Sequence, residues 1–382
     1  MKSQLLLIID LGSSVIKAAV VDVHQELPSA ILAMHAVSSK GLHRGNIVDQ
    51  ALFHQSLRTL FQAINTEHLV KVNQVKALIS STQTRSLNSQ GIARVLQNEV
   101  TDYDIQRVHE IVKAIPMNEN ECVLHQMNQQ YLLDYVAWEQ APLRQKGTRL
   151  ECSAHLVVVK KALIELIDQT FKSLGMSDVA IGCGVMQSID LLNKASDQGV
   201  AILDIGAGGC QLAVYDRSSV VLSDVMALGV HDILLEIENR FQCGAKVARV
   251  LFEKHASLSF IMGEHDPFIE TQVGGEMVRI DRAKLSHLIQ QGYQAVFEFV
   301  LVALKNMSGI SLGQGLYIVG GGSAMPDLLE FAKKQLKTDD VKIVLDQYWF
   351  VKGAAKAALK KHDEVENKQF FPKLKAFWQV HF

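Results

Sequence analysis

Apolar residues fall along the chain in two kinds of pattern, which follow each other in turn. Leu5–Ile9 and Val15–Asp22 are short apolar runs on either side of a polar turn, as in two consecutive strands. Over residues 50–65 the apolar side chains recur every three or four positions, which predicts a helix with one buried face. A strand is predicted at Val75–Ile79 and a helix at Ala162–Leu174. This alternation indicates an α/β fold.

The second half of the chain repeats the opening pattern of the first. Strands are predicted at residues 200–203, 210–216 and 315–319, and helices at residues 230–241, 246–257, 281–307, 326–337 and 349–361. When Asp10 is aligned with Asp204, matching residues follow without a gap: Gly12 with Gly206, Ala19 with Ala213, Val20 with Val214, and Asp22 with Asp216. A unit that occurs once in each half indicates two related lobes, because solenoid repeats recur every ~20–50 residues.

Residues 82–163 interrupt the alternation and are predicted to be an inserted subdomain. A polar stretch is followed by a helix near Asp102–Ala114 and by short strands around Glu121–Tyr135 and Arg149–Val159. The remaining boundaries are predicted as follows: first-lobe core 1–81 with 164–190 and 346–361, second-lobe core 191–226 and 303–345, outer subdomain of the second lobe 227–302, charged linker 362–369, and tail 370–382.

Three glycine-containing turns carry the candidate chemistry. Two of them begin with an aspartate at the end of a strand, Asp10 and Asp204, and the third is Gly320–Ser323. Small residues let backbone N–H groups approach an anion closely, and successive N–H groups form a nest for phosphate oxygens. A carboxylate at such a strand end can hold Mg²⁺ through water. Two hairpins facing each other would therefore enclose the phosphates of one nucleotide, with the third turn beside its nucleoside.

Composition and missing motifs exclude several other classes. The sequence has neither GxxxxGK(S/T) nor GxGxxG, which argues against P-loop and Rossmann sites. Its five cysteines are far apart and form no CxxC, which favours reduced thiols and offers no zinc site. With 40 acidic and 38 basic side chains, the net charge of −2 argues against a nucleic-acid partner. No signal peptide or apolar run of ~20 residues is present, so a cytoplasmic protein is expected.

The three turns and the insert together resemble a known family. Asp-Leu-Gly-Ser-Ser, Asp-Ile-Gly-Ala-Gly-Gly and Gly-Gly-Gly-Ser resemble the phosphate-1, phosphate-2 and adenosine motifs of the actin/Hsp70/sugar-kinase ATPase superfamily. Residues 98–108, 123–134 and 147–155 resemble the inserted subdomain of the FtsA family of bacterial cell-division proteins, and residues 41–49 resemble an early loop of that family. Hsp70, MreB and sugar kinases would lack this insert.

The resemblance implies a two-lobed actin-like ATPase fold with an SHS2-like insert in the first lobe. It implies ATP as ligand with Mg²⁺, self-assembly into protofilaments, anchoring of the tubulin-like protein FtsZ, and recruitment of later divisome proteins. The expected location is the cytoplasmic face of the inner membrane at the division site. The nucleotide-binding residues implied are Asp10, Gly12, Ser13, Ser14 and Lys17 in the first loop, Asp204, Gly206, Ala207, Gly208 and Gly209 in the second, and Gly320, Gly321, Gly322 and Ser323 beside the nucleoside. Asp10 and Asp204 are expected to hold the Mg²⁺.

The chain departs from the superfamily pattern where nucleotide chemistry takes place. Gly209 and Gln211 stand where a hydroxyl and a further aspartate are frequent. Arg249 and Phe252 stand at the acid and the lysine of the helix that contacts ribose and adenine. Arginine accepts no hydrogen bond from a ribose hydroxyl. ATP binding with weak or absent hydrolysis is therefore predicted, and no catalytic residue is assigned.

The last 13 residues have the spacing of an amphipathic helix. Five large apolar side chains fall on one face: Phe370, Phe371, Leu374, Phe377 and Trp378. Lysines lie largely off this face, which is typical of a helix lying in a membrane interface. At ~1.5–3 kcal/mol for each buried large side chain, such a helix would anchor the protein reversibly. The alternative is a C-terminal helix packed on the protein's own core.

Partners are predicted from the resemblance and from charge. FtsZ is expected on the outer subdomain of the second lobe, where Arg279, Arg282 and Lys284 would meet an acidic peptide, although a solvated charged face is an equal alternative. Two other functions on the same fold remain open. One is a PilM-like scaffold of a pilus assembly system, and the other is a small-molecule kinase or ATPase, for which the cleft should hold a further catalytic aspartate.

Overall fold

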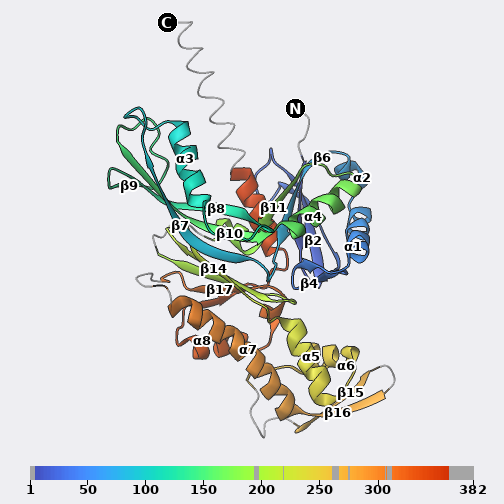
Figure 1. Cartoon of the computed structure of the whole chain (residues 1–382). Coiled ribbons are helices and arrows are strands. Elements are labelled where there is room, and N and C mark those ends of the chain that lie inside the picture. The colour runs from blue at the N-terminus through green and yellow to red at the C-terminus, as the bar shows by residue number, and fades with distance from the viewer. Residues whose placement is uncertain are drawn as a thin grey trace.

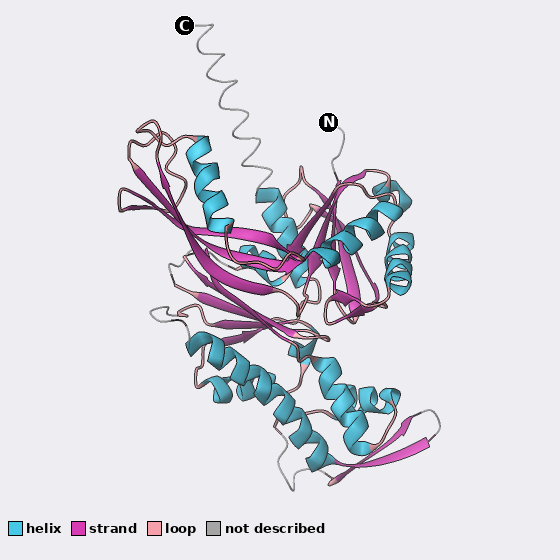
Figure 2. Ribbon diagram, in the orientation of Figure 1, coloured by secondary structure: helices cyan, strands magenta, loops and turns pink. Residues whose placement is uncertain are grey.

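Two five-stranded sheets with the same strand order form the centre of the molecule in a computed structural model (Figures 1 and 2). The structure describes residues 5–192, 198–217, 219–259, 266–273, 276–305, 307 and 312–360. The first sheet has the order β11-β6-β1-β2-β3 and the second β18-β17-β12-β13-β14. In each, a central strand pairs antiparallel with the next strand of its hairpin and parallel with its neighbour on the other side. The repeat seen in the sequence is therefore a repeat of sheet topology.

The first lobe covers its sheet on both faces. Its strands are β1 (Leu5–Leu11), β2 (Val15–Asp22), β3 (Ile31–Ser38), β6 (Val72–Ile79) and β11 (Val179–Cys183). Its other elements are β4 (Leu42–His43), β5 (Asn46–Ile47), α1 (Gln50–Ala63), α2 (Thr66–Leu69), α4 (Lys161–Ser173), the 3₁₀ helix η1 (Val185–Leu191) and a helix over residues 349–360. Helices α1 and α4 bury one face, and η1 with the last helix buries the other. Strand β1 is buried along its whole length, as its continuous apolar run predicts.

The second lobe consists of a sheet and a helical outer part. Its sheet strands are β12 (Val200–Ile205), β13 (Cys210–Asp216), β14 (Ser219–Met226), β17 (Leu316–Val319) and β18 (Val341–Ile343). The other elements are α5 (Val230–Phe241), α6 (Ala245–His255), α7 (Arg282–Lys305), α8 (Leu328–Leu336), the hairpin β15 (Phe268–Val273) and β16 (Glu276–Asp281), and the 3₁₀ helix η2 (Gly321–Ala324). Figure 1 shows α5, α6 and this hairpin at the end of the molecule farthest from the insert.

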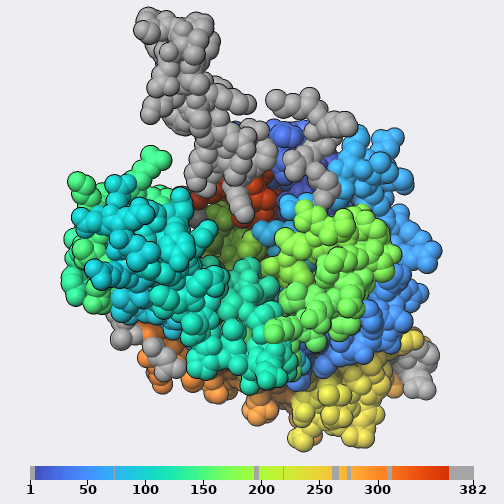
Figure 3. Space-filling view, turned by 45° about the horizontal axis from the view of Figure 1, so that its top comes forward, coloured from blue at the N-terminus to red at the C-terminus, as the bar shows by residue number. Residues whose placement is uncertain are grey.

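The inserted subdomain is a four-stranded antiparallel sheet carrying one helix. Its strands follow the order β7-β10-β8-β9, with β7 (Arg85–Arg94), β8 (Glu121–Leu133), β9 (Val136–Trp138), β10 (Arg149–Lys160) and the helix α3 (Asp102–Lys113). Helix α3 begins at a capping box in which Thr101 and Asp104 satisfy each other's backbone N–H groups. In Figure 3 the insert, coloured cyan to green, forms one face of the molecule together with the first lobe.

The predicted insert is wrong in two details. The strands expected to be short are long, with 13 residues in β8 and 12 in β10. The stretch read as polar contains strand β7, and two of its polar side chains hydrogen-bond to the second lobe. Asn88 Nδ2 donates to the carbonyl of Val221 at 3.0 Å, and the Ser86 hydroxyl donates to the carbonyl of Ser223. The insert thus covers the outer edge of β14, an edge that would otherwise expose unpaired backbone groups.

Candidate functional site

The three glycine-containing turns line one cleft between the lobes, with a volume of about 520 Å³. The first turn joins β1 to β2, the second joins β12 to β13, and the third follows β17. Every residue expected to contact the nucleotide is in the wall of this cleft, from Asp10 to Ser323. The structure therefore brings together the residues that the motifs singled out.

Asp10 and Asp204 occupy equivalent positions in the two hairpins but have different partners. Both are buried, at 4% and 5% exposure. In the β1–β2 ladder Asp10 lies opposite Lys17, whose Nζ is 3.3 Å from Asp10 Oδ2. In the β12–β13 ladder Asp204 lies opposite Gln211, which is uncharged. Burial and the negative charge of Asp10 raise the pKa of Asp204 to about 7, against a smaller opposing effect of Lys17.

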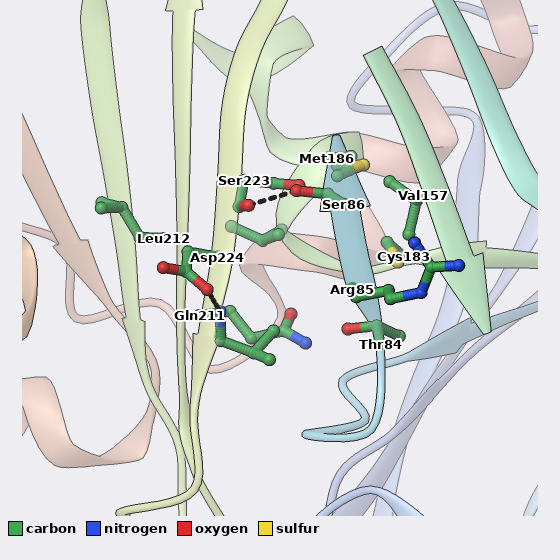
Figure 4. A pocket seen from close by; sticks show the side chains of 12 residues that line it. Thr84, Arg85, Ser86, Val157, Cys183, Met186, Gln211, Leu212, Ser223 and Asp224 are labelled. Carbon is green, nitrogen blue, oxygen red and sulfur yellow. Dashed lines mark hydrogen bonds between the residues drawn. The ribbon is translucent and has the colours of Figure 1, made fainter. Parts of the chain in front are cut away.

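Gln211 does not face the nucleotide cleft. It is 3% exposed and lines a separate cavity of about 20 Å³ with Thr84, which precedes β7, and Ser86, near the start of β7 (Figure 4). Its Oε1 is buried without a hydrogen-bond partner among the described residues. The cavity has room for about one water molecule, which would satisfy this oxygen. Glutamine at position 211, where the superfamily frequently has aspartate, therefore affects the contact with the insert rather than the wall of the cleft.

The glycines of the second and third turns are required by close packing. A Cβ on Gly209 would lie 2.5 Å from Thr82 Cγ2 and 2.8 Å from the carbonyl oxygen of Met226, so a serine or threonine does not fit. Gly320 has a φ of +89° and lies directly against the carboxylate of Asp204. Only glycine combines this backbone conformation with so close an approach.

The third turn leads into η2 before helix α8 begins. A helix was predicted from Pro326, but α8 starts at Leu328, and the turn nearest the cleft is the 3₁₀ helix η2. The turn is fixed from two sides: the Tyr293 hydroxyl donates to the carbonyl of Gly322 at 2.8 Å, and the Ser323 hydroxyl donates to that of Gly320 at 2.7 Å. The backbone of this turn, rather than the end of a long helix, borders the nucleoside end of the cleft.

Helix α6 supplies the opposite wall with three residues, one of which the sequence did not reveal. Arg249 and Phe252 line the cleft as expected, and Glu253 lines it too. Arg249 Nη1 and Glu253 Oε1 are 3.6 Å apart, and both side chains are more than half exposed. An acid four residues after Arg249 lies on the same helix face, which is the signal that could have identified it. Burial, with Arg249 and His43 adding to the effect, lowers the pKa of the adjacent His231.

The two buried aspartates fit a divalent cation bound together with phosphate. Mg²⁺ in nucleotide sites takes one or two carboxylates and completes its shell with water and phosphate oxygens. Asp10 and Asp204 meet this requirement, and the raised pKa of Asp204 reflects its burial and the nearby charge of Asp10. Among the described residues, no cluster of three or more His, Cys, Asp or Glu side chains could hold a metal ion.

The basic residues suggested for FtsZ lie in the outer part of the second lobe, away from the cleft wall, and each has a partner. Arg279 stacks over the ring of Phe268 at 4.1 Å and lies 3.6 Å from Glu270. Arg282 Nε donates to the carbonyl of Asp266 at 3.0 Å, and Lys284 pairs with Asp281 at 3.6 Å. Arg279 and Lys284 remain largely exposed.

The amphipathic tail predicted at 370–382 and the linker before it lie outside the described residues. None of the described helices is long and apolar enough to span a membrane.

Comparison with known proteins shows what the insert and the chain as a whole are similar to. Residues 81–158 match the SHS2 domain inserted in FtsA. Over 346 residues the chain is 26% identical to the cell division protein FtsA of Neisseria meningitidis serogroup B, a match that covers 86% of this chain and 80% of that protein. The resemblance to FtsA is confirmed. The FtsA-like insert explains why residues 82–163 break the alternation of the two lobes.

Solved structures establish the fold of this FtsA-like chain as actin-like. The PilM–PilN type IV pilus biogenesis complex gives a TM-score of 0.66 at 13% identity, covering 94% of this chain and 99% of that one. MreB5 of Spiroplasma citri bound to AMPPNP gives a TM-score of 0.60 at 15% identity, covering 96% of this chain and 100% of that one. The actin-like fold with an SHS2 insert is thus the fold predicted from the motifs.

Proposed function

We propose that the protein acts in cell division as an actin-like, nucleotide-binding protein of the FtsA type. The observation that carries this proposal is the similarity to a cell division protein FtsA over 86% of the chain, the insert included. The cleft supports the proposal independently, because the two aspartate turns and the third glycine turn all line the same cavity. An MreB relative of the same fold is described as bound to AMPPNP.

The proposed ligand is ATP with Mg²⁺. The backbone of the first two turns would hold the phosphates, Lys17 would neutralise part of their charge, and Gly320–Ser323 would border the nucleoside. Asp10 and Asp204 would hold Mg²⁺ through water, and the bound cation would offset the repulsion between phosphates and these two carboxylates. Because the pKa of Asp204 is raised, this carboxyl would be partly protonated in the free protein near neutral pH, and a bound cation would favour its ionised form.

Slow or absent hydrolysis is part of the proposal, because most acids of the cleft have either a partner or a place in the proposed cation site. Among the described residues that line it, the carboxylates are Asp10, Asp204, Glu253 and Asp346. The first two belong to the proposed cation site, Glu253 pairs with Arg249, and Asp346 Oδ2 pairs with Lys352 at 2.7 Å. General-base catalysis needs an available group within hydrogen-bond reach of the attacking water. A nucleotide that controls assembly, rather than one that is turned over rapidly, suits this arrangement.

The proposed assembly is a protofilament on the inner membrane that anchors FtsZ. The tail residues Phe370, Phe371, Leu374, Phe377 and Trp378 would form the anchor, so that the protein is peripheral on the cytoplasmic face at the division site. FtsZ would meet the outer part of the second lobe at Arg279, Arg282 and Lys284, and later divisome proteins would join the assembly. The exposed heads of Arg279 and Lys284 suit an acidic peptide.

A PilM-like scaffold of a pilus assembly system is the second candidate. It is favoured by the TM-score of 0.66 with the PilM–PilN complex. That likeness, at 13% identity, concerns the fold, whereas the similarity to FtsA extends to the sequence. The two candidates differ in the use of the tail, since a pilus scaffold would be held by a membrane-protein partner. A small-molecule kinase is less well supported, because the described part of the cleft wall provides no further unpaired aspartate.

Co-sedimentation with liposomes tests the proposal. The full chain and a chain ending at Gln369 are mixed with vesicles containing anionic lipid, with and without FtsZ. A Phe377→Ser/Trp378→Ser variant tests the apolar face, and Gln379→Ser is the matched control off that face. We expect the full chain and the control to sediment and to bring FtsZ down, and the other two to stay in solution.

Two results would count against parts of the proposal. Sedimentation of the full chain without FtsZ would retain the anchor and reject the partner. If the full chain and the shortened chain both stay in solution, the tail does not bind membranes and the pilus scaffold becomes the better interpretation.

A further inference from the structure

One ion pair joins the two lobes beside the phosphate turns. Arg44 lies in the turn between β4 and β5 of the first lobe, and Asp232 lies in the first turn of α5 in the second. Arg44 Nη2 is 2.6 Å from Asp232 Oδ1, and the two side chains are 36% and 28% exposed. The pair is therefore partly shielded from solvent, where a charged hydrogen bond is stronger than on an open surface.

Arg44 is fixed to the first lobe through its backbone. Its carbonyl accepts hydrogen bonds from Thr82 N at 3.1 Å and from Asn46 Nδ2 at 2.9 Å. It has a φ of +51°, a left-handed conformation imposed by the tight turn. Its Nε is buried without a hydrogen-bond partner among the described residues, a cost that the contact with Asp232 offsets. The backbone of Arg44 is thus held by the first lobe, while its side chain reaches across to the second lobe.

Asp232 is coupled to the second phosphate turn. Its Oδ2 accepts a hydrogen bond from Gly229 N at 2.8 Å, which fixes the start of α5. From that start, Val230 N donates to Gly206 O at 3.1 Å and His231 N donates to Ala207 O at 2.8 Å. Three hydrogen bonds therefore couple the position of Asp232 to the backbone of residues 206–207.

The two phosphate turns touch where this pair holds them. A Cβ on Gly208 would lie 2.6 Å from Ser13 Oγ and 2.8 Å from Arg44 Cα. The Ser13 hydroxyl in turn accepts a hydrogen bond from Gly45 N at 2.9 Å. The first turn, the second turn and the Arg44 turn consequently form one packed contact, with the cleft on one side of it.

We infer that the Arg44–Asp232 pair is a positioning contact that holds the second phosphate turn against the first and keeps the lobes closed before nucleotide binds. The effect on nucleotide rests on the proposed function, whereas the effect on closure does not. When a site is already closed, binding carries a smaller free-energy cost of ordering the protein. The ligand is therefore bound more tightly and released more slowly. Loss of the pair should open the cleft in the free protein and speed release.

The variants are chosen to preserve the folded turn. Arg44→Asn removes the charge and suits a positive φ, and Arg44→Lys keeps the charge. Arg58→Asn is the control, because Arg58 is exposed on α1 of the same lobe. Asp232→Arg and the exchanged pair Arg44→Asp/Asp232→Arg both lose the cap on α5, so the difference between them reports mainly on the charges at these two positions.

Two measurements are made on the full chain: small-angle X-ray scattering without nucleotide, and the release rate of a fluorescent ATP analogue. For Arg44→Asn and Asp232→Arg we expect a larger radius of gyration and about threefold to tenfold faster release. Arg44→Lys should recover most of both effects. The exchanged pair should lie closer to the wild type than Asp232→Arg does, although it still lacks the cap on α5, and Arg58→Asn should match the wild type.

The inference is overturned if Arg44→Asn changes neither the scattering nor the release rate, or if the exchanged pair is no better than Asp232→Arg. If the wild-type chain does not bind the analogue at all, the proposed function is wrong, and the scattering comparison alone decides whether the pair closes the lobes.

Discussion

The two aspartates of the cleft show how much one neighbour changes the chemistry of equivalent residues. Asp10 and Asp204 end equivalent strands, but Lys17 lies opposite the first and Gln211 opposite the second. Burial and the charge of Asp10 raise the pKa of Asp204 to about 7, against a smaller opposing effect of Lys17. When the two hairpins are aligned in the sequence, Gln211 stands at the position of Lys17, so the sequence itself shows this asymmetry. The sequence does not show that Gln211 points to the insert, because that orientation depends on packing between segments far apart in the chain.

Gly320 is the residue whose replacement should damage the cleft most directly. Gly320→Ala places a methyl group against the Asp204 carboxylate at a φ of +89°, which costs roughly 1–3 kcal/mol of folding free energy and displaces the carboxylate. We expect a lower unfolding midpoint and at least tenfold weaker ATP binding. Gly175→Ala is the control, since Gly175 also has a positive φ but has open space around it. Equal ATP affinity in both variants would contradict the placement of Asp204 at the ligand.

His155 gives the molecule a predictable pH dependence. Burial lowers its pKa to about 4, whereas an unfolded chain would have a pKa near 6.5. The unfolded state therefore binds more protons between these values, and stability is complete above pH ~6.5 and falls as the pH drops towards 4. At pH 5 the loss from this residue should be about 2 kcal/mol. Chemical unfolding at pH 7.5 and 5 measures it.

The control for this prediction is an exposed histidine. His155→Gln should reduce the stability difference between the two pH values, whereas His287→Gln, on the exposed side of α7, should leave it unchanged. Burial also lowers the pKa of His125 to about 4, so this residue should contribute to the same loss of stability at low pH. An unchanged pH difference in His155→Gln would show that this imidazole is not buried in the neutral form.

The sequence predicts elements well where apolar spacing decides them and poorly where contacts between distant segments do. Helices α1, α4 and α5 begin and end within about two residues of their predicted bounds. Strand β7 was missed because its Ser, Asn and Gln side chains lack an apolar alternation. Two of these side chains, Ser86 and Asn88, hydrogen-bond to the second lobe, a contact that no local pattern in the sequence indicates. Glu253 was missed for a related reason, since the expected acid was sought at position 249.

The contact between β7 and β14 should stabilise the outer edge of the second-lobe sheet. Asn88 bonds Val221, and Ser86 bonds Ser223. In a Ser86→Ala/Asn88→Ala variant we expect amide hydrogen exchange in residues 219–224 to speed up about tenfold, with exchange in β12 unchanged. Gln90→Ala is the control on the same strand, because Gln90 bonds Glu151 inside the insert. Unaltered exchange in β14 would mean that these two hydrogen bonds do not stabilise this edge.

At the scale of the whole molecule, the repeated sheets, the insert and the cleft form one arrangement. The two sheets place equivalent turns on either side of the cleft, the Arg44–Asp232 pair joins them, and the insert braces the second lobe at β14. The motifs in the sequence predicted the cleft residues and the fold. The contacts between the lobes, Arg44 with Asp232 above all, could not be predicted, because they join residues 188 positions apart.

Isothermal titration of the full chain with ATP tests the central claim, that this cleft is a nucleotide site. We predict binding of one ATP per chain in the presence of Mg²⁺, weakened at least tenfold when Mg²⁺ is removed or in Asp204→Ala. Asp216→Ala, at the far end of the same hairpin, should bind as the wild type does. Absence of ATP binding by the wild-type chain, or binding that is the same in Asp204→Ala, would contradict the claim.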